Sequence, residues 1–330
     1  MALLPAHTVT FSSAKLAVLI GGKVARIKVR RTNREELPGI SVLRDAAAAD
    51  LDAFPSNRGV LDLDMEVDPD LQHLITHDPD GFFTATDRDE TLGFGAAHVR
   101  SRQCVLSELW VLPQHRGNGA GRALLERLLA YGDRSGAREF LAVAPTEGAI
   151  QSVLLDHGFL PMTPVYLFAL TAEQAGRLAA ALTRLLPGGD ATADLVAHRG
   201  QAEVDRIDRV TRNITRAVDH TYWLRSLGLR AAFVRRGDRI VAYAYGGASQ
   251  VGPVAGGTQE AALAALGWAC RLALDAGMGE LLWVRVPARF TGALEALRDV
   301  GARLEATLLV YGKGSTLAFD RSLFGPIALP

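Results

Sequence analysis

The sequence predicts an α+β protein in which antiparallel strands dominate. Residues 82–112 contain three apolar, strand-like segments joined by short polar turns, which is typical of a β-meander. Segments with helical spacing of apolar residues are placed irregularly between the strands, unlike the strict alternation of a doubly wound sheet. The chain has 330 residues, of which 48% are hydrophobic, so two domains of ordinary size can each bury a core.

Local patterns predict the elements of the first half. Residues 40–44 have strand character, and the alanine-rich residues 46–54 predict a helix. Pro113 ends the third strand of the meander, because proline donates no ladder hydrogen bond. The other expected elements are a helix at 70–77, strands at 82–86, 91–99 and 105–112, a helix at 120–131, a strand at 138–144, a helix at 146–157, and a terminal hairpin within 159–170.

The second half repeats this order weakly. An amphipathic helix is expected at 171–186 with Thr171 as its N-cap, and the Pro-Gly-Gly-Asp sequence at 187–190 marks the domain boundary. The repeat predicts two tandem copies of one fold. We therefore divide the chain into an N-terminal extension (1–38), a first domain (39–172), a linker helix and linker (173–190) and a second domain (191–330). The expected elements of the second domain are strands at 195–198, 231–235, 239–245, 281–286 and 304–311, and helices at 203–211, 258–276 and 291–300.

Composition excludes several classes of function. Lys plus Arg equals Asp plus Glu at 36 each, which argues against nucleic acid as a partner. The apolar run 16–20 is far shorter than the roughly 18 residues of a membrane span, and no signal-peptide cleavage site follows it. Cys104 and Cys270 lie in apolar runs, which favours buried thiols and a reduced, cytoplasmic compartment. Richness in Ala, Arg and Gly indicates a bacterial genome, and the N-terminal extension is expected to be partly disordered or to add an edge strand.

Residues 106–122 combine a strand, a glycine-rich turn and the start of a helix. Glycines let a ligand approach the main chain, and the first helical N–H groups lack intrahelical acceptors. Together with the helix dipole they form an anion site, next to the positive charges of Arg116 and Arg122. The segment therefore predicts a phosphate or pyrophosphate site.

Three kinds of phosphate loop fit this description to different degrees. A Walker loop requires Gly-Lys-Ser/Thr, but this chain has Gly121-Arg122-Ala123. A dinucleotide-binding loop requires a third glycine where Arg122 stands. The third pattern, Arg/Gln-x-x-Gly-x-Gly/Ala, is matched without a gap by Arg116, Gly119 and Gly121.

With this loop, residues 40–170 resemble the GNAT superfamily of N-acetyltransferases. The resemblance includes the strand end at 110–113, the helix that begins near Ala120, and the sequence Asp-His-Gly-Phe at 156–159. It implies acetyl-CoA as co-substrate, with its pyrophosphate on the amides of residues 117–122 and its pantetheine arm along the strand 105–112. Main-chain N–H groups near Val111 would hold the thioester oxygen. The expected cofactor-binding residues are Trp110, Val111, Leu112, Arg116, Gly117, Asn118, Gly119, Ala120, Gly121 and Arg122.

The resemblance also implies an acid and a base for the reaction. Glu108 matches the family's carboxylate base, and its apolar strand predicts burial and a raised pKa. The position of the usual tyrosine acid holds Leu154, and that of a common asparagine holds Glu147. The prediction is direct acetyl transfer to a primary amine of a small molecule or peptide. Because Leu154 carries no acidic proton, the alternative is a non-catalytic acyl-CoA-binding or regulatory protein. Weaker candidates for the acid are Ser152, His157 and Tyr166.

The remaining candidates are less specific. The acidic run from Asp62 to Asp70 would attract a cationic amine, although a solvated loop is the favoured interpretation. His73 and His77 have metal-ligand spacing, but a solvated helix face is favoured and no metal is expected. Residues 251–258 lack the Arg-x-x-Gly-x-Gly pattern, so the second half is expected to be a degenerate repeat that lines the acceptor site. The oligomeric state stays open between monomer and homodimer. Tyr222, Trp223, Tyr243 and Tyr245 are expected in the core or, alternatively, in the acceptor cleft.

Overall fold

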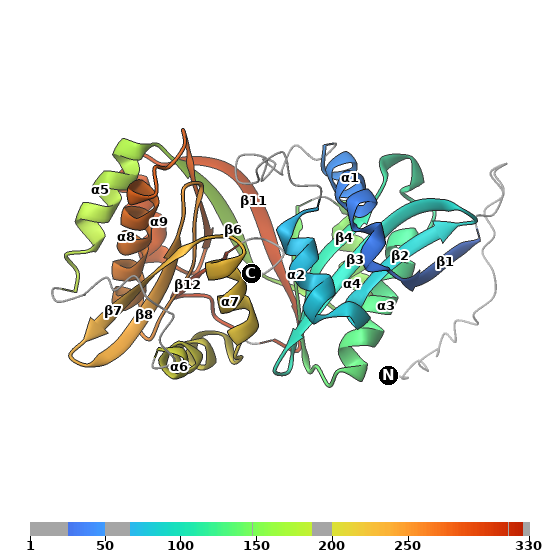
Figure 1. The fold of residues 1–330 in the computed structure, drawn as a ribbon, viewed down its shortest axis with the longest axis horizontal. Helices are drawn as coiled ribbons and strands as arrows, with labels where there is room; N and C mark the ends of the chain where they lie inside the picture. Colours follow the sequence, from blue (N-terminus) through green and yellow to red (C-terminus); the bar gives the residue numbers. More distant parts are fainter. Residues whose placement is uncertain (1–25, 50–66, 147, 187–199, 316, 326–330) are drawn as a thin grey trace, which may run out of the picture.

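A computed structural model describes residues 26–49, 67–146, 148–186, 200–315 and 317–325. Within these residues one twelve-stranded sheet runs through both halves (Figure 1). Its strand order is β1-β2-β3-β4-β5-β11-β6-β10-β9-β8-β7, and β12 pairs with β9. The strands are β1 (Ile27–Arg31), β2 (Phe82–Asp87), β3 (Glu90–Arg100), β4 (Gln103–Val111), β5 (Glu139–Pro145), β6 (Leu160–Leu170), β7 (Arg230–Arg236), β8 (Arg239–Gly246), β9 (Gln250–Gly256), β10 (Leu282–Pro287), β11 (Arg303–Lys313) and β12 (Ser322–Leu323).

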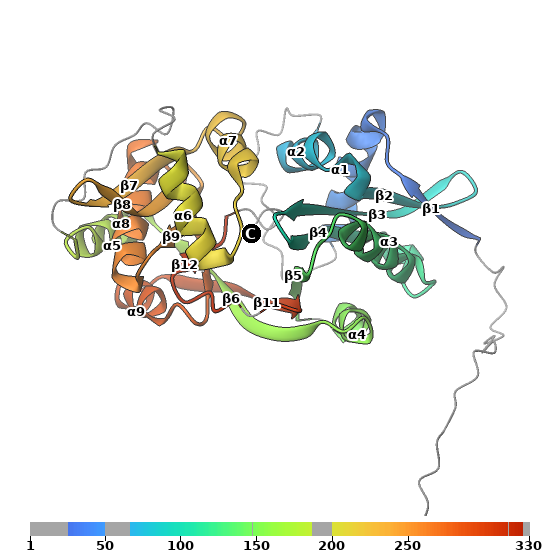
Figure 2. The same cartoon turned by 90° about the horizontal axis from the view of Figure 1, so that it is seen from below.

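Helices cover both faces of the sheet (Figure 2). One apolar core lies between α3 and the strands of the first half, and another lies between α5, α8, α9 and the strands of the second. On the opposite face, a single core joins α1 and α2 with α6 and α7, so the two halves share one layer there. The helices are α1 (Leu37–Ala48), α2 (Pro69–His77), α3 (Ala120–Arg134), α4 (Gly148–Asp156), α5 (Ala172–Leu182), α6 (Gln201–Arg212), α7 (Ala217–Arg225), α8 (Gln259–Asp275) and α9 (Thr291–Asp299), with 3-10 turns η1 (Arg34–Glu36), η3 (Pro79–Gly81) and η4 (Pro113–His115).

The two halves exchange their last long strands. β11, from the second half, pairs antiparallel with β5 and with β6. β6, from the first half, lies between β11 and β10. Each half therefore completes its sheet with a strand of the other, which makes the sheet continuous.

Two expectations for the first half are wrong. Residues 40–44 lie in α1, not in a strand, because Leu37, Ile40, Leu43 and Ala47 recur at helical spacing and bury one face. Residues 160–170 form one strand, not a hairpin, since their antiparallel partners come from the second half.

The helix expected at 46–54 overlaps only the end of α1, which begins nine residues earlier and ends at Ala48, and residues 50–54 lie outside the described residues. The other expected elements with described residues are present, with small shifts at their ends. The N-terminal extension does add an edge strand, since β1 pairs with β2. Cys104 and Cys270 are free and buried, as expected. Helix α7 and strand β9 were not expected from the sequence. The predicted strand at 195–198 and the boundary at 187–190 lie outside the described residues.

Candidate acyl-CoA and acceptor site

The glycine loop links β4 to α3 as the sequence predicts. Gly119 is the N-cap of α3, with a φ of 95° and no side-chain cap hydrogen bond. Gly117 also has a left-handed φ, of 80°, a region that L side chains rarely adopt. No hydrogen bond from the amides of Gly117, Asn118 or Gly119 is found within the described residues. The Ala120 amide, at the start of α3, donates to the Asn118 side chain at 3.0 Å. The three loop amides before it are thus the exposed main-chain donors that can meet an anion.

The two arginines of the loop have different surroundings. The Arg116 guanidinium folds back, with Nε donating to the Val111 carbonyl at 3.2 Å and Nη2 to the Ala47 carbonyl at 3.0 Å. It thereby connects the loop to β4 and to the end of α1. Arg122 pairs with Asp156 of α4 at 2.5 Å, with half of each side chain exposed. Part of the charge that Arg122 would offer to an anion is therefore already compensated.

β4 and β5 separate beside this loop. Their parallel ladder covers only Gln103–Leu106 of β4 and ends before Ser107. A bulge lies at the same point, since the register with β3 shifts between Leu106 and Glu108. Leu112 donates its amide to Leu92 on the β3 side, at 3.0 Å. Because strand amides alternate in direction, the Val111 amide points to the edge that β5 has left open.

Glu108 lies just beyond the point where the two strands separate. Its side chain is buried and accepts a hydrogen bond from the indole N–H of Trp110. Burial raises the pKa of the Glu108 carboxyl to about 7, while Arg44 and Trp110 oppose this rise. A carboxyl group with this pKa can take up and release a proton near neutral pH.

A polar cluster surrounds Glu108 on the α1 and α2 side of the sheet. Arg44 of α1 donates to Asp68 at 2.6 Å, and its Nη1 lies 3.9 Å from Glu108. Asp68 caps α2 by accepting from the amides of Asp70 and Leu71. Asp70 accepts a 2.6 Å hydrogen bond from Tyr222, which lies on α7 of the second half.

Several sequence expectations change at this cluster. Asp68 and Asp70 are buried, so the favoured solvated loop is wrong for them, while Asp62 and its neighbours up to Glu66 lie outside the described residues. Sequence reasoning missed Arg44, which it placed in a strand. The only available signal was the helical spacing of the apolar residues around it.

The position of the usual tyrosine acid is also described by the structure. Leu154 is buried in the apolar core under α3 and offers no proton. Ser152 is exposed on α4, and His157 hydrogen-bonds the Val153 carbonyl through Nδ1 at 2.7 Å. Tyr166 lies on β6 beside Phe168, in the exchanged strand. Within the part of the chain that the structure describes, none of these side chains forms a hydrogen bond or ion pair with Glu108 or its polar cluster.

The two histidines of α2 have different surroundings. His73 is buried and bonded to Asp219, contrary to the expected solvated face, whereas His77 is exposed. Among the described residues, no group of three or more His, Cys, Asp or Glu side chains is arranged to hold a metal.

The second half has a gap that corresponds to the one between β4 and β5, and we call this gap the second slot. It is filled by the chain itself. β9 and β10 pair only at Gln250 and Val251 before they separate. β12 enters the gap: its Ser322 and Leu323 pair with β9, and the adjacent Phe324 bridges to β10. The start of α8 is also closed, since the Thr258 side chain accepts from the Ala261 amide.

With this geometry in place, the chain can be compared with known proteins. Residues 46–159 match the family model for the acetyltransferase (GNAT) family. These residues form a GNAT acyltransferase domain. This family uses acetyl-CoA, and the open start of α3 and the gap between β4 and β5 fit such a substrate. A search of curated protein sequences finds no significant match.

Solved structures extend the similarity of fold to 87–95% of the chain. A Pyrococcus horikoshii protein described as an acetyltransferase aligns over 95% of this chain and 98% of its own, with a TM-score of 0.71 and 15% identity. A GCN5-related N-acetyltransferase from Sphaerobacter thermophilus covers 87% and 95%, with a TM-score of 0.58 and 18% identity. A tandem GNAT protein from the clavulanic acid biosynthesis pathway covers 88% and 99%, with a TM-score of 0.54 and 12% identity. These similarities establish the tandem GNAT fold.

No helix among the described residues has the length and apolar character required to cross a bilayer.

Proposed function

We propose that this GNAT protein transfers the acetyl group of acetyl-CoA directly to a primary amine of a small molecule or peptide. The observation that carries the proposal is Glu108, a buried carboxyl group with a pKa near 7, placed where β4 leaves β5. The pyrophosphate would bind the amides of residues 117–122, and the pantetheine arm would lie along the open edge of β4. The cytoplasmic and bacterial setting expected from composition remains a prediction.

In this mechanism Glu108 acts as the general base. The amine nitrogen attacks the thioester carbonyl, a C–N bond forms, and the proton of the attacking nitrogen passes to Glu108, directly or through water. The Val111 amide stabilises the charge that develops on the thioester oxygen. The C–S bond then breaks, and the thiolate takes its proton from solvent, because the buried Leu154 has none to give.

Acetyl-CoA binding is tested first by thermal unfolding. A ligand present at roughly 100 times its Kd stabilises the folded state by about 2.7 kcal/mol, so acetyl-CoA is expected to raise the Tm. No shift with any acyl-CoA would contradict the proposed site.

Catalysis is tested by thiol release from acetyl-CoA across a panel of amines. Glu108→Gln is expected to lower kcat by about 10²–10⁴-fold and to leave the acetyl-CoA shift intact. Glu126→Gln, an exposed carboxylate on α3, is the matched control and is expected to keep full turnover. Equal turnover in the Glu108 variant and the control would refute the role of Glu108 as general base. Binding without turnover on any amine would instead favour a regulatory protein.

A further inference from the structure

Helices α2 and α7 come from different halves and lie side by side (Figures 1 and 2). Two hydrogen bonds connect them. Tyr222 donates to Asp70 at 2.6 Å, and His73 bonds to Asp219 at 2.9 Å. The rings of His73 and Tyr222 stack with centroids 4.2 Å apart. The four side chains are buried, so water does not compete for these contacts.

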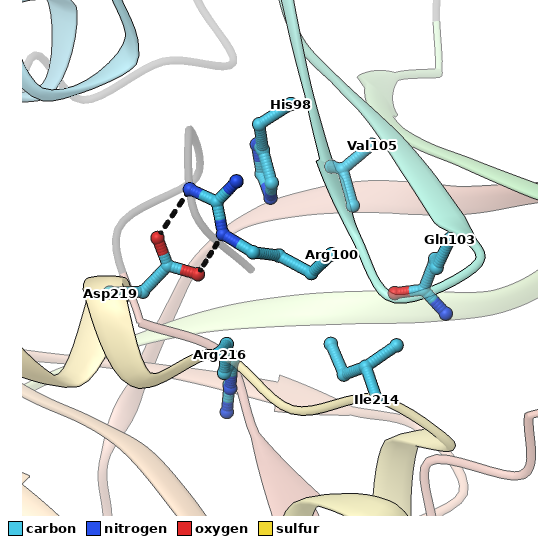
Figure 3. A pocket seen from close by; sticks show the side chains of 7 residues that line it. All are labelled: His98, Arg100, Gln103, Val105, Ile214, Arg216 and Asp219. Atoms are coloured by element: carbon cyan, nitrogen blue, oxygen red, sulfur yellow. Dashed lines mark hydrogen bonds and ion pairs between the residues drawn. The ribbon is translucent and has the colours of Figure 1, made fainter. Parts of the chain in front are cut away.

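α7 is also held against β3. Arg100 makes two hydrogen bonds to Asp219, of 2.9 and 2.7 Å, and a third to Asp78 at 2.9 Å (the pair with Asp219 is drawn in Figure 3). Bidentate arginine–carboxylate pairs fix both position and orientation. The small pocket beside this pair has a volume of about 10 Å³, which is close to the minimum for one water. The hydrogen bonds of Arg100 therefore hold helix α7 in place, which leaves the Tyr222 hydroxyl little freedom to move away from Asp70.

Asp70 faces charged or titratable groups from five elements. Burial raises its pKa to about 6, the neighbouring Asp68 adds to the rise, and the Tyr222 hydrogen bond opposes it. Asp70 in its charged form in turn adds to the rise in the pKa of Glu108. The groups around Asp70 are Arg44 of α1, the N-cap Asp68 and His73 of α2, Glu108 of β4, Tyr222 of α7 and Arg285 of β10.

Given the proposed role of Glu108 as base, we propose that Tyr222 is a positioning residue which the second half supplies to the site of the first. By donating to Asp70, Tyr222 keeps this carboxylate charged near Glu108 and so sets the pH range in which Glu108 takes up a proton. The second half thereby acts on the reaction although its own slot is filled by β12.

The sign of the effect follows from these interactions. Tyr222→Phe removes the hydrogen bond that favours charged Asp70, so Asp70 becomes neutral at higher pH than before. Less negative charge then faces Glu108, and its pKa falls. Asp70→Asn removes the same charge directly and is expected to lower the pKa of Glu108 as well.

The indole N–H of Trp110 reports on Glu108 without any need for an acceptor. We would label tryptophan with ¹⁵N, assign the Trp110 indole signal with Trp110→Phe, and titrate the full chain from pH 5 to 9. The wild-type signal is expected to titrate near pH 7 and to stay flat in Glu108→Gln. In Tyr222→Phe and Asp70→Asn the midpoint is expected to fall by roughly 0.5–1 pH unit. In the double variant Tyr222→Phe/Asp70→Asn, the midpoint should fall no further than in Asp70→Asn alone.

Tyr131→Phe is the matched control, because it also removes a buried tyrosine–aspartate hydrogen bond, to Asp78 at 2.9 Å. Its midpoint is expected to equal that of the wild type. An unchanged or higher midpoint in Tyr222→Phe would overturn the inference, as would a Trp110 signal that still titrates in Glu108→Gln. The proposed function is tested separately, by the acetyl-CoA thermal shift and by the turnover of the wild type and of Glu108→Gln, neither of which depends on the midpoint in Tyr222→Phe.

Discussion

Arg44 Nη1 of α1 lies 3.9 Å from Glu108 Oε1 of β4. The guanidinium is largely buried, with a side-chain exposure of 17%, and its Nη2 is bound to Asp68. Arg44 thus provides the positive charge next to three buried carboxyl groups. Its effect on the pKa of Glu108 is opposite to that of Asp70, so the pKa of this proposed base depends on the balance between charges on helices α1 and α2.

Replacing Arg44 should move the pH dependence of turnover upward. In Arg44→Gln the charge that lowers the pKa of Glu108 is lost, so a higher pH is required to deprotonate the base. The rising limb of kcat/KM against pH, expected near 7 in the wild type, should shift up by roughly one unit or more. Arg127→Gln, an exposed arginine on α3, should leave the limb in place. A limb that moves down in Arg44→Gln would contradict the electrostatic account.

Gly119 is expected to matter for both stability and acetyl-CoA binding. Alanine at its φ of 95° should cost about 1–2 kcal/mol, because this backbone region disfavours a Cβ. Relief of that strain would turn the N-cap amides away from the bound pyrophosphate. The Kd for acetyl-CoA, measured by calorimetry, should therefore rise about tenfold or more in Gly119→Ala, which corresponds to about 1.4 kcal/mol.

Gly136 supplies the comparison for this variant. It lies after the other end of α3 with a φ of 77°, and a Cβ there would meet no neighbour within 4 Å. Gly136→Ala should lower the Tm through similar backbone strain and leave the Kd unchanged. If both variants weakened binding equally, the effect would come from general destabilisation and not from the loop.

One acetyl-CoA should bind per chain. In the first half, the amides of Gly117, Asn118 and Gly119 make no hydrogen bond within the described residues, whereas Thr258 caps α8 and β12 fills the gap beside β9. Isothermal calorimetry should give a stoichiometry of one. A value of two would show that acetyl-CoA displaces β12 from the second slot.

Leu323 should be important for the stability of the second half. Its side chain is fully buried in the core formed with α8, and it pairs with Val254. Leu323→Ala should lower the free energy of unfolding by about 2–5 kcal/mol, measured by urea denaturation. Leu304→Ala, at a position 51% exposed, should cost much less. Because Leu323 lies in the second slot, its variant should keep the wild-type Kd for acetyl-CoA at a temperature where it is folded.

Residues whose role depends on local sequence were predictable. The turn at Gly117–Gly119 and the start of α3 depend on adjacent residues, and both were placed correctly. The burial of Glu108 followed from the apolar residues on either side of it. Residues 40–44 were predicted wrongly because a short apolar run fits a strand and a helix equally well, and only packing against β4 and α2 decides between them.

The sequence by itself determined that this chain has a glycine-rich turn between a strand and a helix, a carboxylate on that strand, and a leucine where an acid is usual in the GNAT family. Those features require only neighbouring residues, because glycine conformation, helix-end amides and strand alternation are local properties. Tertiary structure alone decided which strands complete each half, that β12 fills the second slot, and that Tyr222 reaches Asp70 across 152 positions of sequence. Such contacts depend on the packing of distant segments, and no local pattern in the chain records them.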